Sequence, residues 1–155
     1  MDHEFFMREA LKEAEAALEA DEVPIGAVVV CDGEIIARAH NCRERLADPT
    51  AHAEILALRE AGRKLGGWRL TGTTVYVTVE PCAMCAGALV QARVGLLVFG
   101  ARDPKAGAAG SLLNLVQFPG FSHWVPVVEG VLAEDAAALL RDFFSQKRGK
   151  ARRGG

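Results

Sequence analysis

The chain has 155 residues, 50% of them hydrophobic and 25% charged, and a formal net charge of −2. A chain of this length forms a single domain with its own core, and no apolar run approaches the roughly 20 residues of a membrane-spanning helix. The N-terminus lacks the basic and then apolar pattern of a secretory signal. We therefore expect one soluble domain in the cytoplasm, with no contact to a membrane.

Basic residues are concentrated at the C-terminus. No acidic residue follows Asp142, whereas the last nine positions carry Lys147, Arg148, Lys150, Arg152 and Arg153. Such a cluster can neutralise phosphate groups. On these residues alone, a solvated and frayed tail is an equally good interpretation.

The first half of the sequence predicts a helix, a hairpin and a second helix. Apolar residues recur at helical spacing over residues 2–20. The runs 25–30 and 34–39 flank a Cys31-Asp32-Gly33 turn and predict a β-hairpin. After an irregular stretch, Asp48 is expected to cap a helix that begins at Pro49 and runs towards Gly62.

The second half alternates predicted strands and helices. Residues 73–79 are rich in β-branched side chains and predict a buried strand. Further elements are expected as a helix over 82–92, a strand over 94–99, a glycine-rich loop, a strand within 125–131 and a helix over about 134–147. This alternation predicts an α/β fold with three α/β/α layers around a mixed sheet.

Metal-ligand residue types occur in the motifs His52-Ala53-Glu54 and Pro81-Cys82-Ala83-Met84-Cys85. Zinc accepts imidazole nitrogen and thiolate sulfur, and a catalytic site uses three protein ligands so that water takes the fourth position. The spacing of Cys82 and Cys85 at a helix start places both sulfur atoms on one face, and the positive helix end favours thiolates. We predict zinc ligation by His52, Cys82 and Cys85.

Glu54 is the predicted catalytic residue. In a continuous helix, side chains two positions apart point to nearly opposite sides, but an ion off the helix end can be approached by both His52 and Glu54. Zinc lowers the pKa of a water ligand, and Glu54 can then carry a proton from that water to a ring nitrogen and to a departing amine.

Other interpretations of these residues remain open. Cys82 and Cys85 alone also fit buried thiols, a redox pair or half of a structural zinc site. A structural site would need a fourth ligand, and the candidates, none of them paired at zinc-knuckle spacing, are Cys31, Cys42, His40 and His123. We therefore favour a catalytic zinc.

With these motifs the sequence resembles the cytidine/deoxycytidylate deaminase superfamily, which carries H-x-E and P-C-x-x-C. Within it the chain is most similar to the bacterial tRNA-specific adenosine deaminases. The similarity covers residues 22–28, 48–54, 79–88, 99–111, 130–134 and the final helix.

The resemblance implies a five-stranded mixed sheet with helices on both sides, one zinc ion per subunit and a homodimer. It implies a deaminase domain over residues 1–146 followed by a basic tail over 147–155. The implied reaction is hydrolytic deamination of the wobble adenosine in a tRNA anticodon loop, which yields inosine and ammonia.

The resemblance also assigns substrate contacts. Asn41 is expected to hydrogen-bond the flipped base, the Ala53 backbone to hold the water or the base, and Asp103 to contact a neighbouring sugar. The remaining contacts to phosphate, flanking bases or a stacked base are Lys105, Arg148 and Phe144. Asn41 as a plain turn residue and Phe144 as core packing are the alternatives.

Two other functions compete with RNA editing. One is deamination of a free base or nucleoside, such as guanine or cytosine, by the same zinc chemistry. The other is a nucleic-acid-binding module with a structural zinc, in which Glu54 would be dispensable. The loop with Asp103 and Lys105 and the C-terminal cations favour an RNA substrate.

Overall fold

The computed structural model describes the backbone of residues 1–154 and the side chains of residues 1–149. Five strands form one mixed sheet in the order β2-β1-β3-β4-β5, in which β1 is antiparallel to β2 and β3 while β3, β4 and β5 run parallel. The elements in chain order are α1 (His3–Glu19), β1 (Gly26–Cys31), β2 (Glu34–His40), α2 (Arg43–Leu46), α3 (Ala53–Leu65), β3 (Thr74–Val79), α4 (Ala83–Gln91), β4 (Leu96–Ala101), β5 (Val127–Val128) and α5 (Ala133–Gly154).

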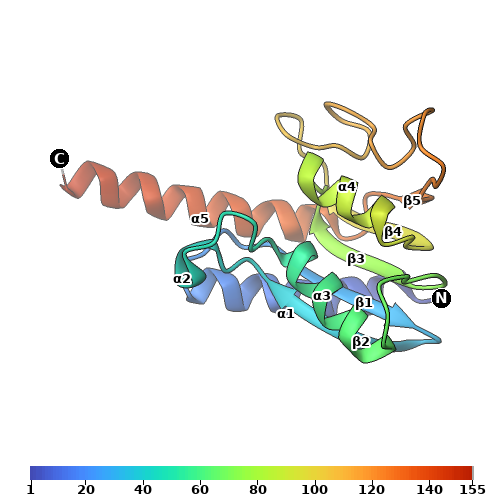
Figure 1. Cartoon of the computed structure of the whole chain (residues 1–155). Helices are drawn as coiled ribbons and strands as arrows, with labels where there is room; N and C mark the ends of the chain where they lie inside the picture. The colour runs from blue at the N-terminus through green and yellow to red at the C-terminus, as the bar shows by residue number, and fades with distance from the viewer. Residues whose placement is uncertain (155) are drawn as a thin grey trace.

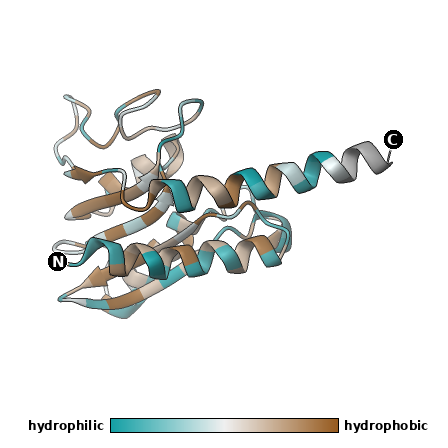
Figure 2. Ribbon diagram, turned by 180° about the vertical axis from the view of Figure 1, so that it is seen from behind, coloured by the Kyte–Doolittle hydropathy of each residue, from teal (hydrophilic) through white to brown (hydrophobic). Residues whose placement is uncertain are grey.

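Helices cover both faces of the sheet, which confirms the predicted three-layer fold (Figure 1). Successive side chains of a strand point to opposite faces. Accordingly, Val28 and Tyr76 pack with α1 and α5, whereas Val29 and Val77 pack with α3 and α4. Figure 2 shows α1 and α5 side by side, with α5 projecting past the end of α1.

The predicted hairpin is present and is closed by Asp32 and Gly33, whose φ angles are 50° and 78°. Two successive positive φ angles are typical of the tight turn that matches the twist of paired strands. An Asp-Gly pair tolerates this backbone, so the local sequence determines the turn.

The helix predicted after Asp48 is present as α3, but its predicted start at Pro49 is wrong. Asp48 Oδ1 accepts hydrogen bonds from the Thr50 N–H and hydroxyl, both at 2.8 Å, and this local turn replaces the first helical turn. The helix α3 begins instead at Ala53, with His52 as its N-cap residue.

Two other elements differ from prediction. The short helix α2 was not predicted. The predicted strand 125–131 is reduced to Val127–Val128, because Pro126 has no N–H to donate and Gly130 adopts a φ of 82°.

The last helix is longer than predicted. α5 continues through residue 146 to Gly154, so the helical backbone runs into the basic C-terminus. The side chains of Lys150, Arg152 and Arg153 lie outside the described residues. Among the helices that the structure describes, none has both the length and the apolar composition that crossing a bilayer requires.

Gly26 allows α1 to approach β1 closely, and we expect Gly26→Ala to destabilise the fold. A Cβ atom at this position would lie 2.1 Å from the Ala10 carbonyl oxygen. Overpacking of this kind costs about 1–3 kcal/mol, measurable as a lower midpoint of urea denaturation. The matched control is Gly87→Ala within α4, where a Cβ atom meets nothing within 4 Å. Equal midpoints for the two variants would contradict the expectation.

Candidate metal centre

Two helix N-termini bring the predicted metal ligands together. His52 is the N-cap residue of α3, Cys82 is the N-cap residue of α4, and Cys85 lies in the first turn of α4. The Nδ1 atom of His52 lies 3.6 Å from Cys82 Sγ and 3.5 Å from Cys85 Sγ. Neither N-cap side chain caps its own helix, because both are directed at this cluster.

The cluster has the dimensions of a tetrahedral metal site. Its three ligand atoms lie within 4.8 Å of one another. With zinc bonds of about 2.0–2.1 Å to nitrogen and about 2.3 Å to sulfur at the tetrahedral angle, a nitrogen and a sulfur ligand lie about 3.6 Å apart. The donor set and its spacing therefore fit a metal ion with one coordination position left for another ligand.

The two thiols differ in acidity. A hydrogen bond from Cys85 outweighs burial and lowers the pKa of Cys82 to about 5. Hydrogen bonding to Cys82, burial and the nearby charge of Glu54 all raise the pKa of Cys85. One thiolate is thus present near neutral pH even without a cation, and a bound cation favours the thiolate form of both.

Glu54 is a buried carboxyl beside the cluster. Only 4% of the residue is exposed, and burial raises its pKa to about 7. Its side chain is within hydrogen-bonding contact of Cys85. A group with this pKa can both take up and release a proton near neutral pH, as a general acid–base residue must.

The proposed fourth ligands of a structural zinc are engaged elsewhere. Cys42 Sγ donates to the His40 carbonyl at 3.3 Å, and His40 Nδ1 lies 3.2 Å from Glu13 Oε1. His123 Nε2 lies 3.0 Å from the Val94 carbonyl oxygen, and Cys31 ends β1 at the hairpin. Within the described part of the chain, the group that could hold a metal consists of His52, Cys82 and Cys85.

Asn41 and Ala53 are hydrogen-bonded to each other at the start of α3. The buried Asn41 side chain accepts a hydrogen bond from the Ala53 N–H through Oδ1 at 2.8 Å. Asn41 is therefore more than a turn residue, because it fixes the first turn of the helix that carries His52 and Glu54. Its contact to a base stays a prediction.

Asp103 and Lys105 lie on the loop that follows β4. Asp103 Oδ1 accepts hydrogen bonds from the backbone N–H groups of Lys105 and Ala106, and the Lys105 side chain is exposed. The Asp103 N–H in turn donates to the buried Glu80 carboxylate at 3.0 Å. The loop is thus connected to the residue that precedes Pro81 and the metal cluster.

Phe144 and Arg148 are exposed on α5. Phe144 is 47% exposed, and its ring packs edge-on against that of Phe143, which is buried. Core packing therefore does not explain Phe144. Among the described hydrogen bonds and ion pairs, none joins Phe144 or Arg148 to the metal cluster.

Two buried carboxylates that organise this region were not singled out from the sequence. Glu80 binds the loop after β4, and Glu22 accepts hydrogen bonds from the backbone N–H groups of Glu44 and Arg45 in α2. The signal for Glu80 was an acidic residue at the end of an apolar run and directly before a proline motif, which is an unusual place for an unpaired charge.

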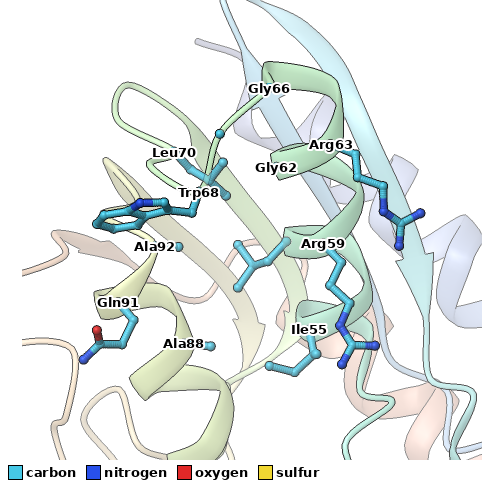
Figure 3. A pocket seen from close by; sticks show the side chains of 12 residues that line it. Ile55, Arg59, Gly62, Arg63, Gly66, Trp68, Leu70, Ala88, Gln91 and Ala92 are labelled. Carbon is cyan, nitrogen blue, oxygen red and sulfur yellow. The ribbon is translucent and has the colours of Figure 1, made fainter.

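A separate groove of about 700 Å³ lies between α3 and α4. Figure 3 shows Ile55 on α3 and Ala88 on α4 lining it, with Trp68 at one end. Trp68 is 57% exposed, and the Arg69 guanidinium lies 4.5 Å from the ring centroid. The predicted metal ligands do not line this groove.

Known proteins match almost the whole chain. The profile of the MafB19-like deaminase family matches residues 1–148. A tRNA-specific adenosine deaminase of Bacillus subtilis (strain 168) is 56% identical over 147 residues, which cover 95% of this chain and 91% of that protein. A chloroplastic tRNA(adenine(34)) deaminase of Arabidopsis thaliana is 46% identical over 91% of this chain, although the match is 12% of that protein.

Solved structures share the fold. A structure from studies of A-to-I editing by tRNA:A34 deaminases has a TM-score of 0.85 and 48% identity, and covers 88% of this chain and 99% of that chain. A guanine deaminase from Nitrosomonas europaea has a TM-score of 0.79 and 30% identity, and covers 90% of this chain and 83% of its own. The fold therefore accommodates more than one amino-purine substrate.

We expect Cys85→Ala to lose the metal that the purified protein carries. Removing one of three protein ligands leaves two, too few to hold the ion tightly. Elemental mass spectrometry should find about one equivalent of metal in the unaltered protein and in Cys31→Ala, the control, because Cys31 lies away from the cluster. Equal metal content in Cys85→Ala would contradict this site.

Proposed function

Because this chain belongs to the family of tRNA-specific adenosine deaminases, we propose that it converts the wobble adenosine of a tRNA anticodon loop to inosine and ammonia. The observation that carries the proposal is the buried Glu54 carboxyl, with a pKa of about 7, beside the cluster of His52, Cys82 and Cys85. The higher identity to the tRNA deaminase structure than to the guanine deaminase, 48% against 30%, supports RNA over a free base.

The proposed cofactor is zinc, held by His52 Nδ1 and by the sulfur atoms of Cys82 and Cys85. A bound zinc ion would act as a Lewis acid and lower the pKa of water, so that the nucleophile hydroxide would form near neutral pH. The low pKa of Cys82 leaves this thiol ready to bind, because only the thiolate is a good ligand.

Glu54 moves the protons of the proposed reaction. The carboxylate takes a proton from the water that adds to carbon 6 of adenine and gives it to ring nitrogen N1. It then takes the second proton of that water and delivers it to the exocyclic amine, which leaves as ammonia while carbon 6 becomes a carbonyl. The burial of Glu54 keeps bulk water from competing for these protons.

Substrate recognition is assigned to residues around the cluster and on α5. Asn41 and the Ala53 backbone adjoin His52, and the Asp103 loop is hydrogen-bonded beside Cys82 through Glu80. Exposure of the Phe144 ring supports a stacking role. A tRNA substrate implies a cytoplasmic enzyme. The proposed RNA contacts are Asn41, Ala53, Asp103, Lys105, Phe144 and Arg148.

The direct test is deamination, measured by mass spectrometry as inosine from an anticodon stem-loop with a wobble adenosine. In parallel, the same measurement follows inosine from free adenosine, uridine from cytidine and xanthine from guanine. We expect product from the stem-loop alone. Turnover of guanine alone would contradict the RNA substrate and would establish the free-base alternative.

The control for the chemistry is Glu54→Gln, which keeps the side-chain volume and removes the titratable group. Loss of a general acid–base residue should lower turnover by about 10²–10⁴-fold, while metal content and stem-loop affinity are retained. Normal turnover by this variant would contradict the proton-transfer role of Glu54.

The basic end of α5 should contribute salt-dependent attraction to RNA. We expect replacement of Arg148, Lys150, Arg152 and Arg153 by Gln to weaken stem-loop binding. The slope of log affinity against log salt should fall by about 0.7 for each phosphate that the variant no longer neutralises. The control is Arg141→Gln on the same helix, because Arg141 is paired with Glu134. An unchanged slope would remove this end of α5 from the RNA-binding surface.

We propose that the enzyme acts as a homodimer through the groove between α3 and α4, because this groove presents apolar side chains that the described part of the chain leaves uncovered. Sedimentation velocity should give twice the chain mass, and Trp68→Glu should shift the protein towards monomer. The matched control is Trp124→Glu, since Trp124 is 52% exposed but lies outside the groove. A monomeric unaltered protein would contradict the proposal.

A further inference from the structure

Glu80 is a buried carboxylate at the junction of the sheet and the metal cluster. It directly follows β3 and precedes Pro81 and Cys82, and only 3% of the residue is exposed. The carboxylate accepts hydrogen bonds from the Asp103 N–H at 3.0 Å, the Ala109 N–H at 3.0 Å, and the Ser111 N–H and hydroxyl at 3.0 and 2.5 Å. All four donors belong to the loop that follows β4.

The backbone of this loop is closed tightly around Glu80. A Cβ atom on Gly107 would lie 2.4 Å from Glu80 Cδ, so only glycine allows the approach. The Ala108 N–H donates to the Pro81 carbonyl at 2.8 Å, which adds a second connection beside Cys82. Although burial raises the pKa of Glu80, these hydrogen bonds together hold it below its ordinary value.

The same hydrogen bonds extend to the residues proposed to bind RNA. The Glu80 carboxylate accepts a hydrogen bond from the Asp103 N–H, and the Asp103 carboxylate accepts hydrogen bonds from the N–H groups of Lys105 and Ala106. The hydrogen bonds therefore run from the residue beside the metal ligand Cys82 to Asp103 and then to Lys105. Charge-assisted hydrogen bonds of this kind are stronger and more directional than neutral ones.

We propose that Glu80 is a positioning residue that fixes the loop of residues 103–111 relative to the metal centre, and so determines how the enzyme holds the nucleotides next to the target base. This inference rests on the proposed function. Glu80 itself touches no reacting atom, because its oxygen atoms are occupied by the loop, and it acts on substrate through Asp103.

A second buried glutamate provides a matched control. Glu22 is also 3% exposed, and its carboxylate accepts hydrogen bonds from the Glu44 and Arg45 N–H groups at 3.0 and 2.8 Å. These bonds organise α2, which is a different segment from the 103–111 loop. The effect of E22Q on stem-loop deamination should therefore be independent of the effect of D103A.

The test is a double-mutant cycle on stem-loop deamination with E80Q, D103A and the pair. An amide nitrogen at position 80 faces N–H groups, so E80Q should loosen the loop and raise KM about tenfold with a smaller change in kcat. If Glu80 acts through Asp103, D103A should add less than about twofold in the E80Q background. In the E22Q background, D103A should have its full effect. Metal content should be unchanged in every variant.

A loop-specific measurement separates positioning from general stability. Hydrogen exchange of peptides covering 103–111 should accelerate in E80Q, while exchange in α3 stays the same. Should E80Q fail to fold, Ser111→Ala removes one of the donors to Glu80 and should give a smaller rise in KM with the same lack of additivity.

If the unaltered enzyme makes inosine but the effects of E80Q or Ser111→Ala are fully additive with that of D103A, this inference alone is overturned. Failure of the unaltered enzyme to deaminate the stem-loop would overturn the proposed function, and this inference with it.

Discussion

The meeting of two helix N-termini is the constraint on which the rest of the site depends. α3 and α4 begin next to each other, and their N-cap residues are His52 and Cys82. Each helix start carries a partial positive charge, so two of them side by side would repel unless negative groups lay between them. The thiolate of Cys82, whose pKa is lowered to about 5, supplies such a group. A predicted metal ligand therefore also offsets the electrostatic cost of the arrangement.

The fold and the metal cluster could be predicted from sequence because their signals are local. The hairpin is determined by Asp32 and Gly33, and the ligands lie at or beside helix starts, where short motifs fix side-chain direction. Prediction failed where distant contacts decide the local structure. α2 is held by Glu22, which lies 22 residues before Glu44, and no periodic pattern encodes that bond. At Pro49, the helix signal was outweighed by a side-chain turn made by Asp48.

The proposed chemistry and the proposed recognition of the substrate are assigned to different kinds of structure in this chain. The metal cluster and Glu54 lie on helix starts packed against a buried sheet, which suits groups that must keep a fixed geometry. Asp103 and Lys105 lie on a loop, and Phe144 lies on an exposed helix surface. A guanine deaminase with the same fold at 30% identity is consistent with this division, because substrate choice can change without altering the chemical centre.

The single continuous helix α5 restricts how the chain can vary. It joins the core at Ala136 and Phe143, which are 1% and 6% exposed, and carries the exposed Arg148 further along the same backbone. A helix turns by about 100° per residue, so an insertion of one residue between Phe143 and Arg148 would rotate the arginine to another side. A cation on a helix also has less backbone entropy to lose on binding than one on an unstructured segment. The number of residues between Phe143 and Arg148 thus sets the direction in which Arg148 points as well as its distance from the core.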